Sequence, residues 1–338
     1  MGGLRFVYSA GFIIGYTCAT MGGYGDPSST YPAYPNWQER AIHVLTNACR
    51  MAPQAFRDAY VGNGSILLPS NYPAVAPVYW NEDLNRVARL HATDMAKNCG
   101  MSHTSCDGTG PFTRIKRYYT KSNTLAENIA YGHANPLSTV VQWLLDGSRS
   151  NPAPDRSGGD GHRRNIMNGS YRELGVGFDT GPQGWPSDNP NPYWVQDFGG
   201  GQSAFTYHPI AAASHCFIES GKTTFLMNYY DAGGGEPTNI EVVVAGVRHD
   251  LSLTLGTAST GTYMVSMPIG HECRSYFFVA TDGGGDEWRY PEDGFLVGYG
   301  EGGCEQGYAG PNATGGEGGR FEPSISVPRG EKPIFGLR

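Results

Sequence analysis

Two of the nine histidines stand in local settings that could do chemistry. His103 lies between Cys99 and Cys106, and a disulfide between these cysteines would close the stretch into a tight loop. His162 follows Asp160 by two positions, where an aspartate can cap a short helix and leave the imidazole in its first turn. Because neutral imidazole is a common ligand of zinc-like ions, both histidines are candidate metal ligands.

His91, Arg163 and Arg164 are better explained by structural roles. His91 lies on the apolar stripe of a predicted helix, so we expect a half-buried, hydrogen-bonded side chain. Arg163 and Arg164 are expected to form a solvated pair rather than an anion-binding clamp. No Gly-x-Ser-x-Gly nucleophile motif and no His-Glu-x-x-His helix occurs, so the familiar protease and esterase motifs are absent.

The elements that must position these residues fall into two parts. Helices are predicted from Asn36, Asn81 and Asn135, because each asparagine is a suitable N-cap before apolar residues at helical spacing. Strands are predicted over residues 173–178 and 193–198. Helices and strands therefore share one unit, residues 36–200.

The pattern changes after residue 201. Short runs rich in β-branched and aromatic residues alternate with glycine clusters about every 8–12 residues, which predicts an all-β, immunoglobulin-like sandwich over residues 205–308. Residues 309–338 are rich in Gly, Pro and Glu and are expected not to pack. The length of 338 residues, about twice a common domain size, agrees with two domains.

The N-terminus predicts export. Arg5 precedes an apolar run over residues 6–16 and small residues to about Gly23, the order of regions in a secretory signal. The run is too short to span a bilayer, which takes about 20 residues, and a buried N-terminal helix or strand is the alternative. We expect a signal peptide at 1–23, a spacer at 24–35, and a protein that is secreted or extracellular, in a periplasm or at a cell surface.

The charge of the chain limits its possible partners, and its cysteine content indicates disulfides. The chain has 24 basic and 31 acidic residues, a net charge of -7, and no basic cluster, which excludes nucleic acid as a partner. Six cysteines remain beyond the signal, and an even number in an exported chain favours disulfides over a thiolate zinc site, the lesser alternative. Six cysteines allow 15 connectivities, so the full pairing stays open. Proximity along the chain favours Cys99 with Cys106, the next most local pair is Cys273 with Cys304, and Cys49 would then remain for Cys216.

Five segments, in order, resemble the CAP superfamily of cysteine-rich secretory proteins, antigen 5 and pathogenesis-related 1 proteins. They are Leu125–Gly132, the helix that contains Trp143, Gly161–Met167, Glu173–Gly177 and Tyr193–Phe198. The resemblance covers about Trp37 to Gly199, and the His-Arg-Arg-Asn-Ile-Met stretch is similar to bacterial members.

The resemblance implies an α+β fold, a three-layer α/β/α sandwich, with a cleft lined by two histidines and two acids. His103 and His162 match the histidines and Glu127 matches one acid. Asp146 stands at the fourth place, where a glutamate is usual, and is shorter by one methylene. Such a quartet can bind Zn2+ through the two imidazoles. Because catalytic zinc usually keeps three protein ligands and only two nitrogens are offered here, the binding is expected to be weak and exchangeable.

Three functions follow from this resemblance. The first is binding of a small apolar, lipid or envelope-derived ligand, or of a surface partner, with the β domain docking onto a surface, polysaccharide or protein. The second is metal-assisted hydrolysis of peptide or cell-envelope polymer, with Glu127 accepting a proton. The third is a structural extracellular module, in which the histidines are merely hydrogen-bonded by Glu127 and Asp146.

Overall fold

The computed structural model describes residues 35–133, 135–181, 191–201, 208–268, 274–292, 294–298 and 308–309. The predicted signal peptide, nearly all of the spacer and nearly all of the tail lie outside these residues, so those boundaries stay predictions. Within the described ranges, no helix combines the length and apolar character needed to cross a membrane.

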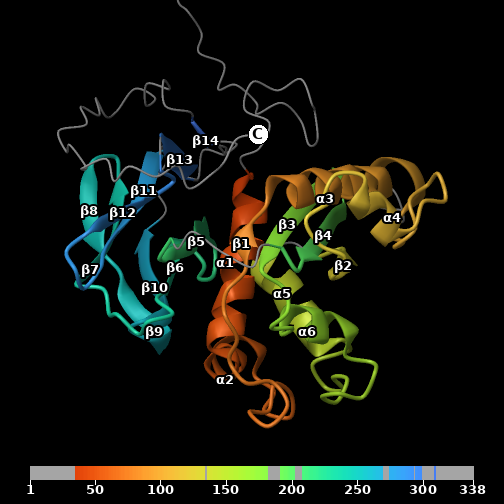
Figure 1. Ribbon diagram of the computed structural model, residues 1–338, viewed down its shortest axis with the longest axis horizontal. Helices are drawn as coiled ribbons and strands as arrows, with labels where there is room; N and C mark the ends of the chain where they lie inside the picture. Colours follow the sequence, from red (N-terminus) through yellow and green to blue (C-terminus); the bar gives the residue numbers. More distant parts are fainter. Residues whose placement is uncertain are drawn as a thin grey trace, which may run out of the picture.

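A four-stranded sheet forms the centre of residues 35–201 (Figure 1). Its order is β1 (Tyr79–Trp80), β3 (Glu173–Gly181), β4 (Asn191–Gly199) and β2 (Leu125–Tyr131), with β1 parallel to β3 and the other pairs antiparallel. Helices α1 (Trp37–Met51) and α5 (Pro136–Leu145) pack on one face, and α3 (Glu82–Asp94) packs on the other. These three layers confirm the α+β class.

The predicted asparagine N-caps are confirmed. Asn36 Oδ1 accepts a hydrogen bond from the Glu39 N–H at 2.9 Å, and the Glu39 carboxylate accepts one from the Asn36 N–H at 3.0 Å, a complete capping box. The side chains of Asn81 and Asn135 cap α3 and α5 by accepting from the N–H groups of Leu84 and Ser138, at 3.0 and 2.9 Å, without the reciprocal bond of a capping box. Shorter helical segments complete this part: α2 (Pro53–Phe56), η1 (Arg57–Val61), η2 (Met95–Cys99), α4 (Pro111–Lys116) and α6 (Gly161–Ile166).

Glycines on one face of β3 allow α3 to lie directly on the sheet. A Cβ on Gly175 would lie 2.0 Å from the backbone nitrogen of Asn85, and a Cβ on Gly177 would lie 2.2 Å from the carbonyl carbon of Ala88. The alternate residues of the strand, including Val176, point into the core shared with α1. The spacing of the glycines therefore sets the distance between this helix and the sheet.

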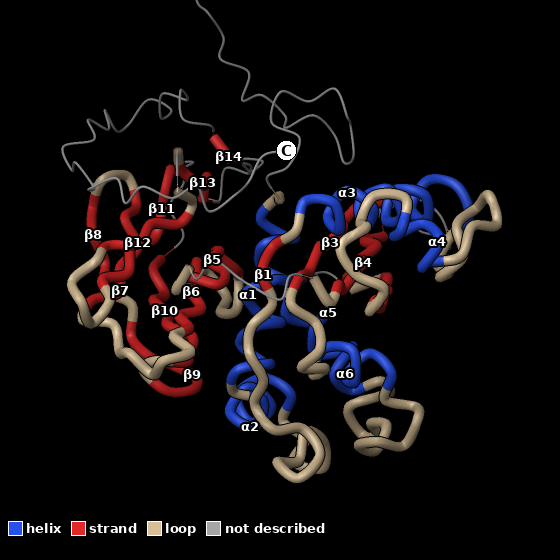
Figure 2. The backbone as a smooth tube through the Cα atoms, viewed as in Figure 1, coloured by secondary structure: helices blue, strands red, loops and turns tan. Residues whose placement is uncertain are grey.

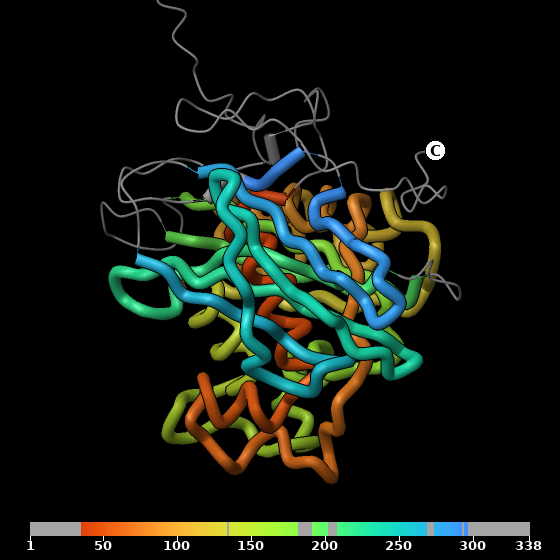
Figure 3. The backbone as a smooth tube through the Cα atoms, turned by 90° about the vertical axis from the view of Figure 1, so that its left-hand side faces the viewer, coloured from red at the N-terminus to blue at the C-terminus, as the bar shows by residue number. Residues whose placement is uncertain are grey.

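Residues 208–309 form two antiparallel sheets, drawn in front in Figure 3. One has the order β5 (Ile210–Cys216), β6 (Lys222–Tyr230), β10 (Thr260–Pro268) and β9 (Ser252–Thr257). The other has β14 (Tyr308–Ala309), β13 (Phe295–Gly298), β11 (Arg274–Thr281), β7 (Asn239–Val244) and β8 (Val247–Asp250), with β12 (Glu287–Tyr290) also on β11. A common core joins the sheets. The antiparallel β region is confirmed, and its immunoglobulin-like class stays a prediction.

Helix α1 stands between the two parts (Figures 1 and 2). Of its 15 residues, 13 are buried, so it has almost no solvent-facing side. Its Ala41 and Leu45 share one core cluster with Leu174 of the first sheet and with Ala212 and Leu226 of the β region. The parts predicted as separate domains are therefore packed around one helix.

The structure tests two of the three predicted cysteine pairs. Cys99 and Cys106 form a disulfide with a Cα separation of 5.7 Å, so that prediction is confirmed. Cys49 and Cys216 are both free and buried, so their predicted pairing is wrong. They act as small core residues of α1 and β5, where burial raises the pKa of each thiol to about 12. Cys273 and Cys304 lie outside the described residues.

Candidate functional site

The structure brings His103 and His162 to one cavity of about 560 Å3. The other residues that line it come from the disulfide loop and from the central sheet: Met101, Ser102, Ile129, Tyr131 and Tyr193. Two imidazoles that are far apart in the sequence therefore face a common, largely apolar space.

The disulfide loop positions His103. Its Nδ1 lies 2.8 Å from Oε1 of Glu127 on β2. The preceding residue is fixed by His91, whose Nε2 lies 2.8 Å from the carbonyl oxygen of Ser102. The expected hydrogen bond of His91 is confirmed, but the expected half-burial is wrong, because the residue is fully buried. The His103 side chain is 51% exposed and the Glu127 side chain 2%. The imidazole therefore stands at the rim, and its carboxylate partner lies beneath it.

Asp146 positions His162. Asp146 ends α5 in the left-handed conformation, with φ 47°. One carboxylate oxygen contacts Nδ1 of His162, and the other accepts a hydrogen bond from the N–H of Arg163 at 3.1 Å. The shorter acid therefore reaches its histidine, and it also satisfies a free N–H in the first turn of α6.

Asp160 does not have the capping role predicted for it. It stands at the N-cap position of α6, but its side chain makes no capping hydrogen bond. Its carboxylate instead accepts hydrogen bonds from the Tyr72 hydroxyl and from the N–H of Arg156, the latter at 2.6 Å. The preceding loop folds around this buried acid and draws it away from the helix.

Sequence reasoning missed two residues beside Glu127. Arg114 of α4 donates to Oε2 of Glu127, and Asp197 on β4 is the direct cross-strand neighbour of Glu127. Asp197 is fully buried, and burial, followed by the negative charge of Glu127, raises its pKa well above the usual range. Alternation along the strand 193–198 could have indicated Asp197, whereas no sequence signal pointed to Arg114.

Asp197 is best described as a neutral acid. If it were ionised, neither of its oxygens would have a donor among the described residues. If it is protonated, its hydroxyl can donate to the neighbouring Glu127 carboxylate, whose charge contributes to the raised pKa of Asp197. The two oxygens of Glu127 contact His103 and Arg114.

Both histidines meet an acid through Nδ1, and among the described residues nothing is hydrogen-bonded to either Nε2. This is the usual arrangement of zinc-binding histidines, in which a carboxylate fixes the tautomer. The residues thus offer two nitrogen donors of the type that a zinc-like ion takes, one from each imidazole. They do not form a denser cage: across the described ranges, the one group of three ligand atoms within 4.8 Å contains Asp94 and the two disulfide-bonded cysteines.

Comparison with known families agrees with this fold. Residues 46–198 match the model of the cysteine-rich secretory protein family, CAP. This part of the chain is a CAP domain, as the five segments predicted.

Similar proteins occur in several bacteria. YkwD and the membrane protein YlbC, both of Bacillus subtilis (strain 168), are 29% identical over 102 and 105 residues, which are 30% and 31% of this chain and 35% and 27% of theirs. The chain thus spans about a third of the length of these relatives. An extracellular SCP-domain protein of Bacillus anthracis aligns with TM-score 0.31 and 23% identity, covering 48% of this chain and 40% of its own. An outer surface protein of Borrelia burgdorferi aligns with TM-score 0.29 and 25% identity, covering 38% of this chain and 80% of its own.

Proposed function

We propose that the CAP domain is a binding module whose cleft takes a small ligand with an apolar part. The observation that carries this proposal is the single cavity that His103 and His162 share with Met101, Ile129, Tyr131 and Tyr193. Its volume, about 560 Å3, lies in the usual range of small-molecule sites.

Exposed apolar surface at the cleft supports this function. Met101 and Tyr131 are 44% and 38% exposed, although large apolar side chains are usually covered. The Tyr131 and Tyr193 rings are stacked at 6.1 Å, which gives a rigid aromatic wall. A ligand that covers this wall gains about 25 cal/mol for each Å2 of apolar surface removed from water.

The contacts of the two acids favour binding over hydrolysis. A general base must reach water or substrate, but the Glu127 carboxylate lies beneath His103 and is held by Arg114. The Asp146 carboxylate is used by His162 and by the start of α6. Both acids therefore orient imidazoles, and the imidazoles form the reactive surface.

A bound divalent metal would use Nε2 of His103 and His162. It would supply an electrophilic centre for a polar group of the ligand. Two nitrogens make a thin coordination shell, so zinc is expected to be weak and exchangeable.

The location proposed for this protein is outside the cytoplasm. The signal-like N-terminus favours export, and the Cys99–Cys106 disulfide is of the kind that persists in oxidising compartments. The two-sheet β region, packed on α1, is proposed to hold the cleft domain against a surface or partner.

Titration with the neutral apolar dye N-phenyl-1-naphthylamine tests the cleft. The Met101→Ser/Tyr131→Ser variant loses about 60 Å2 of apolar contact, or about 1.5 kcal/mol, so about tenfold weaker binding is expected. Leu253→Ser, which removes an exposed leucine on β9, is the matched control and should bind like wild type. Equal dye affinity in all three proteins would exclude the cleft as the apolar site.

Zinc calorimetry separates the binding function from the hydrolase alternative. His103→Ala/His162→Ala should lose zinc binding while the dye still binds. A hydrolysis screen with peptide and envelope-polymer substrates should show no zinc-dependent turnover. Turnover that disappears in Glu127→Ala would instead establish the hydrolase.

A further inference from the structure

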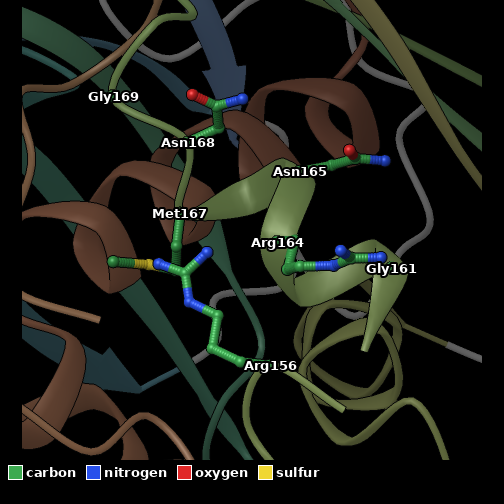
Figure 4. Close-up of a pocket in the computed structure, with 7 residues that line it drawn as sticks. All are labelled: Arg156, Gly161, Arg164, Asn165, Met167, Asn168 and Gly169. Atoms are coloured by element: carbon green, nitrogen blue, oxygen red, sulfur yellow. The ribbon is translucent and has the colours of Figure 1, made fainter. Parts of the chain in front are cut away.

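A second cavity, of about 580 Å3, contains none of the residues assigned to the cleft. Its polar lining comes from the loop before α6, from α6 and from the segment after it: Arg156, Arg164, Asn165 and Asn168. Figure 4 shows Arg156 reaching toward Met167, while Arg164 lies along α6 near Gly161. Two guanidinium groups therefore line one hollow.

The contacts that hold Arg156 and Arg164 do not use all of their N–H donors. The Arg156 guanidinium lies 4.4 Å from the centre of the Tyr72 ring, and its Nη2 donates to the carbonyl oxygen of Asn71 at 2.7 Å. Nε of Arg164 lies 3.2 Å from the Asp160 carboxylate. Because a guanidinium carries five N–H donors, both side chains keep donors for a ligand.

The acids near the cavity are already engaged and buried beneath it. Asp160 accepts from Tyr72 and from the Arg156 backbone, and Asp155 lies 3.0 Å from Nε of buried Arg163. No carboxylate is among the residues that line the cavity. Arg156, Arg163 and Arg164 carry three positive charges, and the two aspartates carry two negative charges. The surroundings of the cavity therefore keep one net positive charge, although the whole chain has a net charge of -7.

Buried Arg50 fixes the end of α6 and the residues that follow it. Its guanidinium donates to the carbonyl oxygens of Ile166 and Asn168, at 2.6 and 3.0 Å. Asn168 Oδ1 in turn accepts from the N–H of Ser170 at 2.9 Å. The segment that carries Asn168 is therefore held in place by Arg50 and Ser170, which do not line the cavity.

We propose that this cavity binds an oxyanion, a phosphate or a carboxylate group, on a ligand larger than a free ion. Guanidinium groups match the planar pairs of oxygens in both groups and remain charged at any physiological pH. A volume of about 580 Å3 suits a small molecule or one unit of a polymer. This inference does not depend on the function proposed for the cleft.

Nuclear magnetic resonance titration of the full chain with sodium phosphate, and separately with sodium acetate, tests the proposal at constant ionic strength set with chloride. Saturable shifts of backbone amides 156–169 are expected with at least one of the two anions. Arg156→Gln/Arg164→Gln should weaken that binding about tenfold or more. Arg117→Gln removes an exposed arginine of the same domain and should bind like wild type.

A second variant keeps the test decisive if the double substitution disturbs the fold. Asn168→Asp retains the acceptor for the Ser170 N–H but adds a negative charge, so it should abolish anion binding. Shifts that chloride alone reproduces, or that persist in Arg156→Gln/Arg164→Gln and in Asn168→Asp, overturn the proposal. The anion that saturates identifies the group, and dye binding at the cleft should be unchanged throughout.

Discussion

Replacing Asp197 by asparagine should stabilise the protein at neutral pH and have less effect in acid. Asp197 and Glu127 are buried neighbours, and Arg114 is the cation bonded to the pair. Burial and the Glu127 charge raise the pKa of Asp197, so the folded protein keeps a proton that the unfolded chain releases above about pH 4.

The size of this effect follows from proton linkage. The folded state binds more protons than the unfolded state, so stability falls as pH rises from the unfolded pKa toward the folded pKa. Each pH unit over which folded Asp197 keeps a proton that the unfolded chain has released costs about 1.4 kcal/mol. Asparagine cannot ionise, and its amide can donate to Glu127 in place of the hydroxyl.

Urea unfolding at pH 5, 6 and 7 measures this difference. The free energy of unfolding of Asp197→Asn minus that of wild type should increase with pH across this range, by about 1.4 kcal/mol per pH unit while folded Asp197 keeps its proton. Asp179→Asn, a buried aspartate of β3 paired with Lys97, controls for the chemical change itself. A difference that does not vary with pH would mean that Asp197 is ionised in the folded protein, and the description of the Glu127 pair would be wrong.

Three further predictions concern the elements that hold the cleft. Gly177→Ala should lower the free energy of unfolding by about 3 kcal/mol in chemical denaturation, because the new Cβ meets the α3 backbone at 2.2 Å. The double variant Cys99→Ser/Cys106→Ser should lose about 2.5 kcal/mol from loop closure and lose zinc affinity as the loop that carries His103 loosens; unchanged zinc affinity would contradict the positioning role. Burial lowers the pKa of His43 from 6.5 to about 4, so its share of stability falls as pH drops from 6.5 to 4, by about 3 kcal/mol, and unfolding curves of His43→Gln should lack this part of the acid loss.

The predictable parts of this fold are those that local sequence determines. Asn36 predicts the start of its helix because the N-cap residue and its partner Glu39 are only three residues apart in the sequence. Strand β5 carried no such signal, since Ala211, Ala212 and Ala213 have low strand propensity. It is a strand because β6 pairs with it and α1 packs on it, and small side chains suit that close packing.

The candidate site divides in the same way. His103 and His162 could be named because their motifs are contiguous, and Glu127 because it lies in a contiguous segment of its own. The roles of Asp197 and Arg114 depend on the register of β4 against β2 and on the placement of α4, which no single segment encodes. The missed residues decide which acid carries the charge, so the electrostatics of the site were less predictable than its members.

Arg163 and Arg164 show most clearly what the sequence could not predict, because these adjacent residues of the same type have opposite environments. The expectation of a solvated pair is wrong for Arg163, which is fully buried and bonded to the carbonyl oxygens of Leu144 and Ala153. Consecutive residues of a helix point about 100° apart, so one arginine faces the core and the other lines the second cavity. The buried arginine ties α6 to the end of α5, and this leaves Arg164 on a fixed helix at the wall of that cavity. Its charge can then bind a ligand without the entropy cost of ordering the backbone.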